Sequence, residues 1–200
     1  MDSYANEMIN SGKIEPIIIV GIYNSPKRND EYMGWSQYHR DNQKEVKNKI
    51  DDQELVRQIA EDYEKYMNNH IKPYIDGNFR TKPDLANTAT GGASSGAMIA
   101  LYMGFKYKDI YSKVAALSGG FDYYIDITKS DFFKTGSGLK IYLDCGTNDL
   151  DKQLLPATVA VKDELLKLDF VENQNLLYYS ADKSGHNEKE WAKRTPAFLE

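Results

Sequence analysis

The stretch from Asn87 to Met103 constrains the fold more than any other part of the chain. Residues 85–91 are small or β-branched, as in a short buried strand, and residues 97–105 are rich in Ala, Leu and Met, as in a helix. Between them, residues 92–96 have the sequence GASSG and match the pattern G-x-S-x-G. In a strand–turn–helix context this pattern predicts a sharp turn with the hydroxyl of Ser94 exposed at its tip. The terminal glycines would let strand and helix pass close together.

A serine in such a turn has two interpretations. It can simply cap the helix that follows, or it can be a nucleophile if a base accepts its proton. The register of the pattern puts Ser94 at the apex, which leaves Ser95 as the less favoured nucleophile. The backbone N–H of Ser95 is then expected to donate to the oxyanion that forms during acyl transfer.

An acidic cluster follows Ser94 along the chain, in residues 144–151 with the sequence DCGTNDLD. We expect Asp149 to be the acid that orients the base, because it falls just after a predicted strand. Asp144 would end that strand, where it could serve only as a structural partner of the turn. Asp151 lies two residues beyond Asp149. Both remain alternatives at this point.

Three histidines are candidates for the base. His70 falls on a predicted amphipathic helix, where a surface position is expected. His39 lies in a polar loop and could contact a substrate, but it precedes Ser94. Serine, then acid, then histidine is the chain order of the α/β-hydrolase triad. His186, in the sequence SGHN, fits this order and is the expected base.

Short apolar runs alternate with helical patterns along the chain. The predicted strands are residues 14–23, 85–91, 113–117, 139–143 and 175–180, and the predicted helices are residues 2–10, 52–69, 97–105, 157–168 and 188–194. This alternation predicts an α/β fold with a parallel sheet and right-handed crossovers. Ser94, Asp149 and His186 each follow a predicted strand, so all three should meet at the carboxyl edge of the sheet.

The first of these strands and the loop after it differ in character. Residues 14–23 are almost continuously apolar, which suits a strand buried on both faces of a parallel sheet. Residues 24–51 are polar and charged with no clean period. A loop of that length inside a compact domain is usually functional or mobile.

Five stretches together resemble an esterase family of α/β-hydrolases that includes enterochelin, feruloyl and acetyl-xylan esterases and S-formylglutathione hydrolases. The stretches are IEPIIIVGIY (residues 14–23) with Arg28 and Glu31-Tyr32, IKPYI (71–75), GGASSGAMIALYMGFKYKDIYSKVAALSGGF (91–121), IYLDCGTND (141–149) and SGHNEKEWAKRTPAFL (184–199). The resemblance covers nearly the whole chain and implies one α/β-hydrolase domain over residues 1–200, with a mostly parallel sheet and flanking helices.

The resemblance also implies an activity. It suggests a serine carboxylesterase that forms an acyl-enzyme with the triad Ser94, His186 and Asp149, without metal or cofactor. The substrate would be a small ester, either a feruloyl or acetyl ester on a carbohydrate or a siderophore-like ester.

Three residues of the polar loop, Arg28, Tyr32 and Trp35, are candidates for binding that ester. Two of them have an alternative. Arg28 could simply pair with Glu31, and Trp35 with its neighbour Tyr38 could anchor the loop rather than line an acyl pocket.

The chain departs from this family at its start. The family carries several earlier strands, including one between the strand that corresponds to residues 14–23 and the nucleophile strand. It also carries a His-Gly-rich loop with the second oxyanion donor, which nothing here matches. We therefore expect an N-terminally truncated hydrolase, weakly active by itself, whose sheet is completed by a missing N-terminal segment or by a second copy. The alternative is a catalytically incomplete fragment that acts as a binding or assembly module.

Composition narrows the classes of protein to which the chain can belong. The 200 residues fit one domain, and 41% hydrophobic with 28% charged residues is typical of a globular protein. A net charge of −5 argues against a nucleic-acid partner. No apolar run approaches the roughly 20 residues that span a bilayer, and the first residues do not resemble a signal peptide. Cys145 is the single cysteine, which suits a reducing compartment and favours the cytoplasm, although the compartment itself stays unknown.

Overall fold

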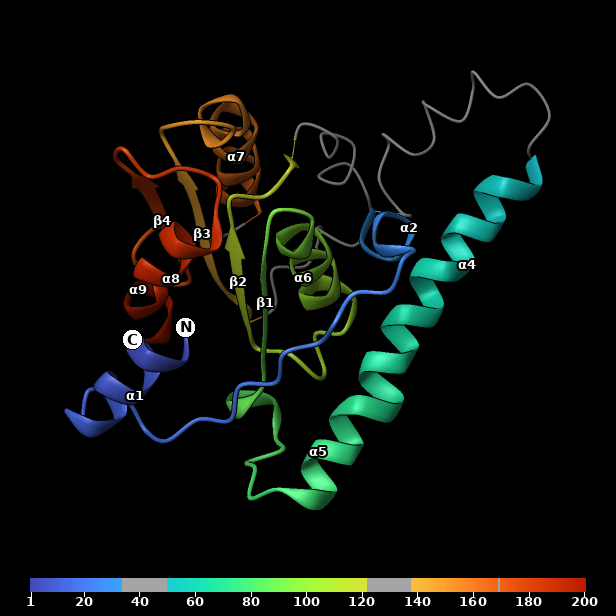
Figure 1. Ribbon diagram of the computed structural model, residues 1–200, viewed down its shortest axis with the longest axis horizontal. Coiled ribbons are helices and arrows are strands. Elements are labelled where there is room, and N and C mark those ends of the chain that lie inside the picture. Colours follow the sequence, from blue (N-terminus) through green and yellow to red (C-terminus); the bar gives the residue numbers. More distant parts are fainter. Residues whose placement is uncertain (34–49, 122–137, 169) are drawn as a thin grey trace.

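A four-stranded parallel sheet forms the centre of the protein in the computed structural model, which describes residues 1–33, 50–121, 138–168 and 170–200. The strands are β1 (Ala89–Ala93), β2 (Lys113–Leu117), β3 (Lys140–Gly146) and β4 (Leu176–Ala181), and they lie in the order β1-β2-β3-β4 (Figure 1). Each strand pairs in parallel with the next one along the chain. The prediction of a parallel α/β sheet is confirmed.

Helices connect and cover these strands (Figure 1). They are α1 (Asp2–Asn10), α2 (Arg28–Met33), α4 (Ile50–Tyr66), α5 (Lys72–Asn78), α6 (Ser95–Lys106), α7 (Asp151–Lys167), α8 (Glu188–Lys193) and α9 (Thr195–Leu199), with a π-helical turn η2 (Met67–Ile71) and a 3₁₀ turn η3 (Leu85–Asn87). The first helix α1 contacts the last helix α9, so the two ends of the chain lie near each other. No helix in the described ranges combines the length and apolarity that crossing a bilayer requires.

Helix α6 is the element around which the core is built. Nine of its twelve residues are buried, because one side contacts β1 and β2 and another side contacts α2. The main core lies between α6, the sheet and α7, and its most deeply buried members include Met98, Leu101, Phe121, Ile141, Leu143, Leu165 and Leu176. A second cluster beyond α6 contains Tyr32, Ile99, Met103 and Tyr111.

Two predicted helix boundaries were wrong, and both errors involve proline. The helix predicted to end before Pro73 continues to Asn78, with Pro73 in the first turn of α5, where a missing N–H is tolerated. The helix predicted to start after Pro156 begins at Asp151 and contains Pro156 in its interior. The second error has a consequence for the site, because it places Asp151 at the start of a helix.

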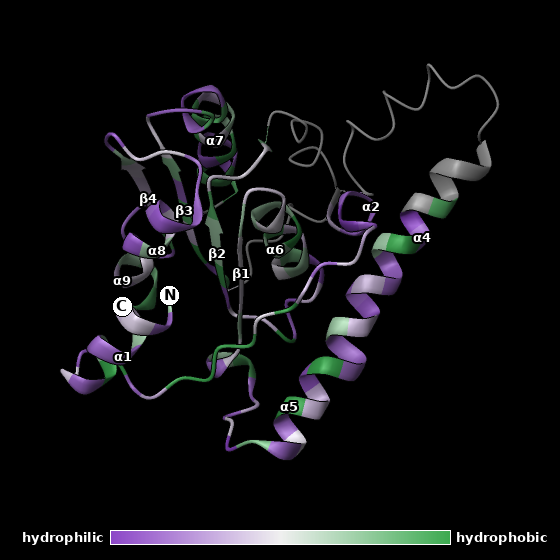
Figure 2. Cartoon of the chain, in the orientation of Figure 1, coloured by the Kyte–Doolittle hydropathy of each residue, from purple (hydrophilic) through white to green (hydrophobic). Residues whose placement is uncertain are grey.

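The predicted strand over residues 14–23 is not formed. These residues form neither a helix nor a strand and pair with no described strand. The apolar run Ile17–Val20 is 40–48% exposed, and Figure 2 shows it as a hydrophobic stretch between α1 and α2. An apolar strand buried on both faces needs strand neighbours, and β1 is an edge strand paired only with β2 within the described residues.

Candidate active site

The turn between β1 and α6 has the geometry that its sequence predicts. Ser94 lies between the last residue of β1 and the first of α6, with φ 57° and ψ −127°. This left-handed backbone is uncommon for a residue with a side chain. A Cβ on Gly92 would lie 2.4 Å from the carbonyl oxygen of Gly96, so the strand and the helix pass too closely for any side chain at position 92. Gly96 itself faces open space.

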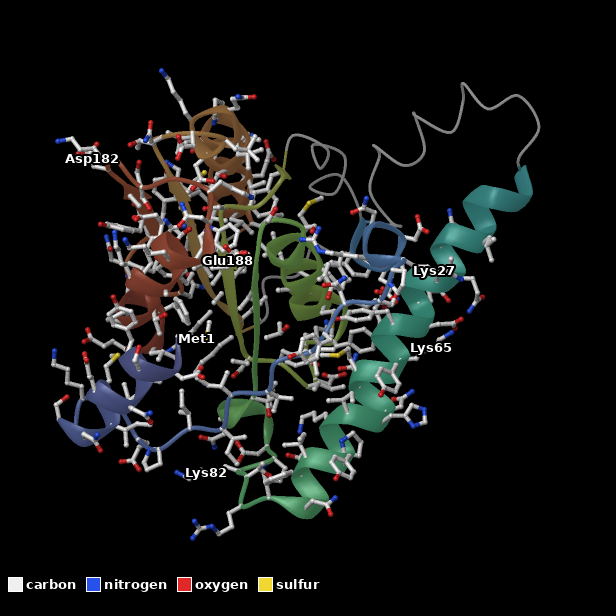
Figure 3. The ribbon with its side chains drawn as sticks, viewed as in Figure 1. Met1, Lys27, Lys65, Lys82, Asp182 and Glu188 are labelled. Carbon is white, nitrogen blue, oxygen red and sulfur yellow. The ribbon has the colours of Figure 1, made fainter. Side chains whose placement is uncertain are left out.

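His186 lies on the loop between β4 and α8 and reaches the nucleophile turn. Its Nε2 is 3.0 Å from the Oγ of Ser94, so the predicted pair of Ser94 and His186 is brought together. The loop is anchored to α8, because the side chain of Asn187 accepts a hydrogen bond from the backbone N–H of Glu190. The ring of Trp191 packs edge-on against the imidazole at 4.9 Å. Glu188 marks the start of α8 in Figure 3.

The acid that reaches His186 is Asp151, and the prediction of Asp149 is corrected. Asp151 Oδ1 is 2.5 Å from Nδ1 of His186, and the Asp151 side chain is fully buried. Asp149 is exposed and has a left-handed backbone, with φ 50°. Its carboxylate lies beside Gly185 rather than at the ring, since a Cβ on Gly185 would be 2.2 Å from Asp149 Oδ2. Asp149 lies in the turn that follows β3. Asp151 is the first residue of α7, and its side chain is buried there.

Asp151 is held as a carboxylate by three donors. Besides the imidazole, its Oδ2 accepts hydrogen bonds from the Ser118 hydroxyl at 2.7 Å and from the backbone N–H of Gly146 at 2.9 Å. Burial by itself raises the pKa of Asp151, but the hydrogen bonds that it accepts outweigh burial, and the pKa lies below the usual value. An ionised Asp151 can only accept, so Nδ1 of His186 carries the proton and Nε2 is free to accept one from Ser94.

Asp144, the other alternative for the acid, has a structural role. It forms a buried ion pair with Arg194, whose Nε donates to Asp144 Oδ2 at 2.7 Å. The hydroxyl of Tyr142 donates to the same oxygen at 2.7 Å. Arg194 and Ser118 were not predicted to contribute to the site, because no motif in the sequence marks either residue.

The backbone N–H of Ser95 opens α6, where the first N–H groups of a helix have no partner inside the helix. This position fits the predicted oxyanion donor. The Ser95 hydroxyl is buried and has no hydrogen-bond partner in the structure.

Two of the three predicted substrate-binding residues, Tyr32 and Arg28, lie in the part of the chain that the structure describes. Tyr32 is 8% exposed and packs against Tyr63, with ring centroids 5.1 Å apart, so it belongs to the second core cluster. The Arg28 guanidinium lies over the Tyr32 ring at 5.6 Å. Glu31 accepts a hydrogen bond from Ser25 at 2.6 Å, so it is held by Ser25 rather than by Arg28.

Trp35, Tyr38 and His39 lie outside the described residues. His70, the remaining histidine, is exposed and packs against Tyr66 in the α4–η2 helix, as expected for a surface residue.

Neither a metal site nor a reactive thiol is found in the part of the chain that the structure describes. In the ranges that the structure describes, no group of three or more histidine, cysteine or acidic side chains could hold a metal ion. Cys145 is fully buried in β3, and burial raises the pKa of its thiol to about 12. A thiol with such a pKa is a poor nucleophile near neutral pH.

A serine on a strained strand-to-helix turn, followed in chain order by an aspartate and a histidine at the same sheet edge, defines the α/β-hydrolase class. The family comparison is more specific: a family model described as "Putative esterase" matches residues 1–199. The chain belongs to this esterase family. A comparison with curated proteins found no match.

Solved structures with the same fold include one serine hydrolase and two esterases. An IroE-like serine hydrolase from Shewanella oneidensis is 17% identical, with a TM-score of 0.67 over 100% of this chain and 66% of its own. An enterochelin esterase from Shigella flexneri is 18% identical, with a TM-score of 0.58 over 69% of this chain and 36% of its own. A ferulic acid esterase from the anaerobic fungus Anaeromyces mucronatus is 18% identical, with a TM-score of 0.57 over 76% and 57%.

These comparisons also show how much of each relative the chain spans. It covers 58% of one ferulic acid esterase and 37% of an enterobactin esterase from Shigella flexneri. The chain therefore corresponds to a part of these larger structures.

Proposed function

We propose that the protein is a serine carboxylesterase that acts through an acyl-enzyme on Ser94. The observation that carries this proposal is the continuous line of hydrogen bonds from Ser94 through His186 to the buried carboxylate of Asp151. Membership of the esterase family supports the same reaction class.

The first half of the reaction acylates the serine. Nε2 of His186 accepts the proton of the Ser94 hydroxyl as the oxygen attacks the carbonyl carbon of the ester. Negative charge moves to the carbonyl oxygen, where the backbone N–H of Ser95 donates a hydrogen bond. The imidazolium is stabilised by ionised Asp151. It then gives its proton to the leaving alcohol as the tetrahedral intermediate collapses to the acyl-enzyme.

The second half repeats these steps with water. His186 accepts a proton from a water molecule, which attacks the acyl carbon, and the proton returns to the Ser94 oxygen when the acid product leaves. Each group is restored at the end of the cycle, and the steps use only these side chains, the ester and water.

The substrate class that we propose is a small ester, either a feruloyl or acetyl ester on a carbohydrate or a siderophore-like ester. Its support is similarity to ferulic acid, enterobactin and enterochelin esterases. A panel of feruloyl, acetyl and catechol-containing esters, compared by kcat/KM, would rank these alternatives.

We further propose that a strand from outside this chain completes the sheet beside β1. The support is that β1 pairs on one side only within the described ranges, while the apolar segment Ile17–Val20 is left exposed. Unpaired strand edges and exposed apolar runs are both unfavourable in water. A strand in this position would also bring further backbone N–H groups to the end of β1, where a second oxyanion donor is required.

The completion of the sheet has its own test. We expect the 200-residue chain to hydrolyse aryl esters weakly, and a protein that continues upstream of Met1 to be faster. Activity that instead rises steeply with the concentration of the given chain would identify a second copy as the source of the strand. Rapid turnover by a dilute, monomeric chain would contradict both versions.

The proposed nucleophile is tested by substitution. In a preparation with measurable turnover, Ser94→Ala should reduce kcat by several orders of magnitude, with about 10⁶-fold as the scale set by triad serines. The matched control is Ser180→Ala, which removes a hydroxyl from an exposed position in β4. Undiminished hydrolysis by Ser94→Ala would refute the proposal. A folded protein with no hydrolysis in any form would favour the alternative of a binding or assembly module.

A further inference from the structure

A buried network of charged and polar side chains lies behind the proposed triad. Arg194 is 5% exposed and forms an ion pair with Asp144, donating from Nε at 2.7 Å and from Nη2 at 3.0 Å. Arg194 also donates from Nη1 to Ser184 Oγ at 2.6 Å and from Nη2 to Ser118 Oγ at 2.7 Å. The network connects the last helices to the ends of β2 and β3.

Ser118 is the link between this network and the acid of the triad. Its hydroxyl is fully buried and lies 2.7 Å from Asp151 Oδ2. Its backbone N–H donates to the carbonyl oxygen of Asp144 at 2.9 Å, which fixes the residue at the end of β2. The hydroxyl oxygen of Ser118 therefore contacts both Asp151 and Arg194.

The direction of these hydrogen bonds follows from the chemistry of the groups. A guanidinium has only N–H donors and no acceptor, so Ser118 Oγ must accept from Arg194. The single hydroxyl proton of Ser118 is then directed at Asp151, which as a carboxylate can only accept. Arg194 thus fixes the hydroxyl in the orientation that donates to Asp151.

The backbone of Ser118 is a second sign of function. Its φ is 46°, in the left-handed region where glycine is the usual residue. Non-glycine residues with such backbones cluster at functional sites, where the surroundings compensate for the strain. A serine at this position supplies a hydroxyl that glycine cannot supply.

We propose that Ser118, oriented by Arg194, is a positioning residue that holds the Asp151 carboxylate in register with His186. The proposal rests on the assignment of Ser94, His186 and Asp151 as the triad. Ser118 and the backbone N–H of Gly146 occupy Oδ2 of Asp151. Oδ1 is thereby turned towards Nδ1 of His186.

Two substitutions and a matched control test this role. Ser118→Ala removes the hydroxyl, and Ser118→Gly removes it while relieving the left-handed backbone, so at least one variant should fold. Ser184→Ala is the control, because it also removes a buried hydroxyl that accepts from Arg194 but does not contact Asp151. We expect kcat to fall about tenfold in both Ser118 variants with KM unchanged, and to stay within twofold in the control.

A second readout does not depend on turnover. The Nδ1 proton of His186, hydrogen-bonded to Asp151, should give a far-downfield proton NMR signal in the wild-type chain. We expect the signal to shift or broaden in both Ser118 variants and to persist in Ser184→Ala. An unchanged signal and an unchanged kcat in Ser118→Gly would overturn the proposal even if Ser94 is the nucleophile. Equal changes in Ser184→Ala would also overturn it, because they would indicate general destabilisation of the network.

Discussion

Replacing Asp151 with asparagine changes one atom group at the centre of the proposed triad. Asp151 Oδ2 accepts from the backbone N–H of Gly146, which cannot reorient, and from the Ser118 hydroxyl. The asparagine oxygen must therefore stay at this position, which turns the NH₂ group towards Nδ1 of His186. Because an NH₂ group can only donate, Nδ1 must then become the acceptor, and the imidazole proton moves to Nε2.

A protonated Nε2 cannot accept the proton of Ser94, which is 3.0 Å away. The equivalent change in a serine protease triad lowers kcat by about 10⁴-fold, which corresponds to about 5.5 kcal/mol of transition-state stabilisation. We expect a loss of this order in kcat for Asp151→Asn, with little change in KM, since Asp151 is buried and out of reach of a substrate.

The assay is hydrolysis of a chromogenic aryl ester by wild type, Asp151→Asn and Asp149→Asn, with folding checked by circular dichroism. Asp149→Asn is the matched control, because it removes the same charge two residues away. Asp149 is exposed, and asparagine tolerates its left-handed backbone, with φ 50°. A large loss in Asp149→Asn with full activity in Asp151→Asn would refute the reassignment of the acid.

Three further predictions concern the turn, the core and the cysteine. Gly92→Ala should abolish labelling of Ser94 by an active-site probe, because its Cβ would lie 2.4 Å from the Gly96 carbonyl oxygen, whereas Gly96→Ala, which faces open space, should be tolerated. Leu101→Ala in the core should lower the free energy of unfolding in urea by about 2–5 kcal/mol, and the half-exposed Leu166→Ala by less than about 1 kcal/mol. Cys145 should resist iodoacetamide in the folded chain and react in urea, because its thiol is buried with a pKa of about 12; rapid reaction without denaturant would contradict its burial.

The elements that could be predicted from sequence are those that local patterns determine. The turn around Ser94 is specified by the glycine at position 92 and by the strand and helix on either side. The cores of strands β2, β3 and β4 follow from short apolar runs, and their parallel order follows from the intervening helices. His186 could be chosen from three histidines because its place in the chain order is a property of the fold.

The acid could not be chosen this way. Asp149 and Asp151 are two residues apart in the same turn, and the difference between them is burial, which depends on where α7 begins. The helix was predicted over residues 157–168, but α7 begins at Asp151, whose side chain is fully buried. Which of the two aspartates becomes buried depends on tertiary contacts, and the short polar sequence of the turn does not indicate it.

Two other features depend on contacts between distant parts of the chain. Residues 14–23 have the composition of a buried strand, but a strand forms only where a partner strand is available, and β1 is not paired with them. Arg194 and Ser118 are 76 residues apart in sequence, yet they share a hydrogen bond. Neither position has a local signal that would distinguish it from a surface residue.

The most direct test of Ser94 as the nucleophile is covalent labelling of the chain with a fluorophosphonate probe, followed by mass spectrometry of its peptides. The probe reacts with serines that are activated as nucleophiles, so it reports the proposed chemistry without requiring a known substrate. We expect a single adduct on Ser94, with labelling lost in Ser94→Ala and strongly reduced in Asp151→Asn. An adduct on Ser95, or a folded chain in which Ser94 stays unmodified, would contradict it.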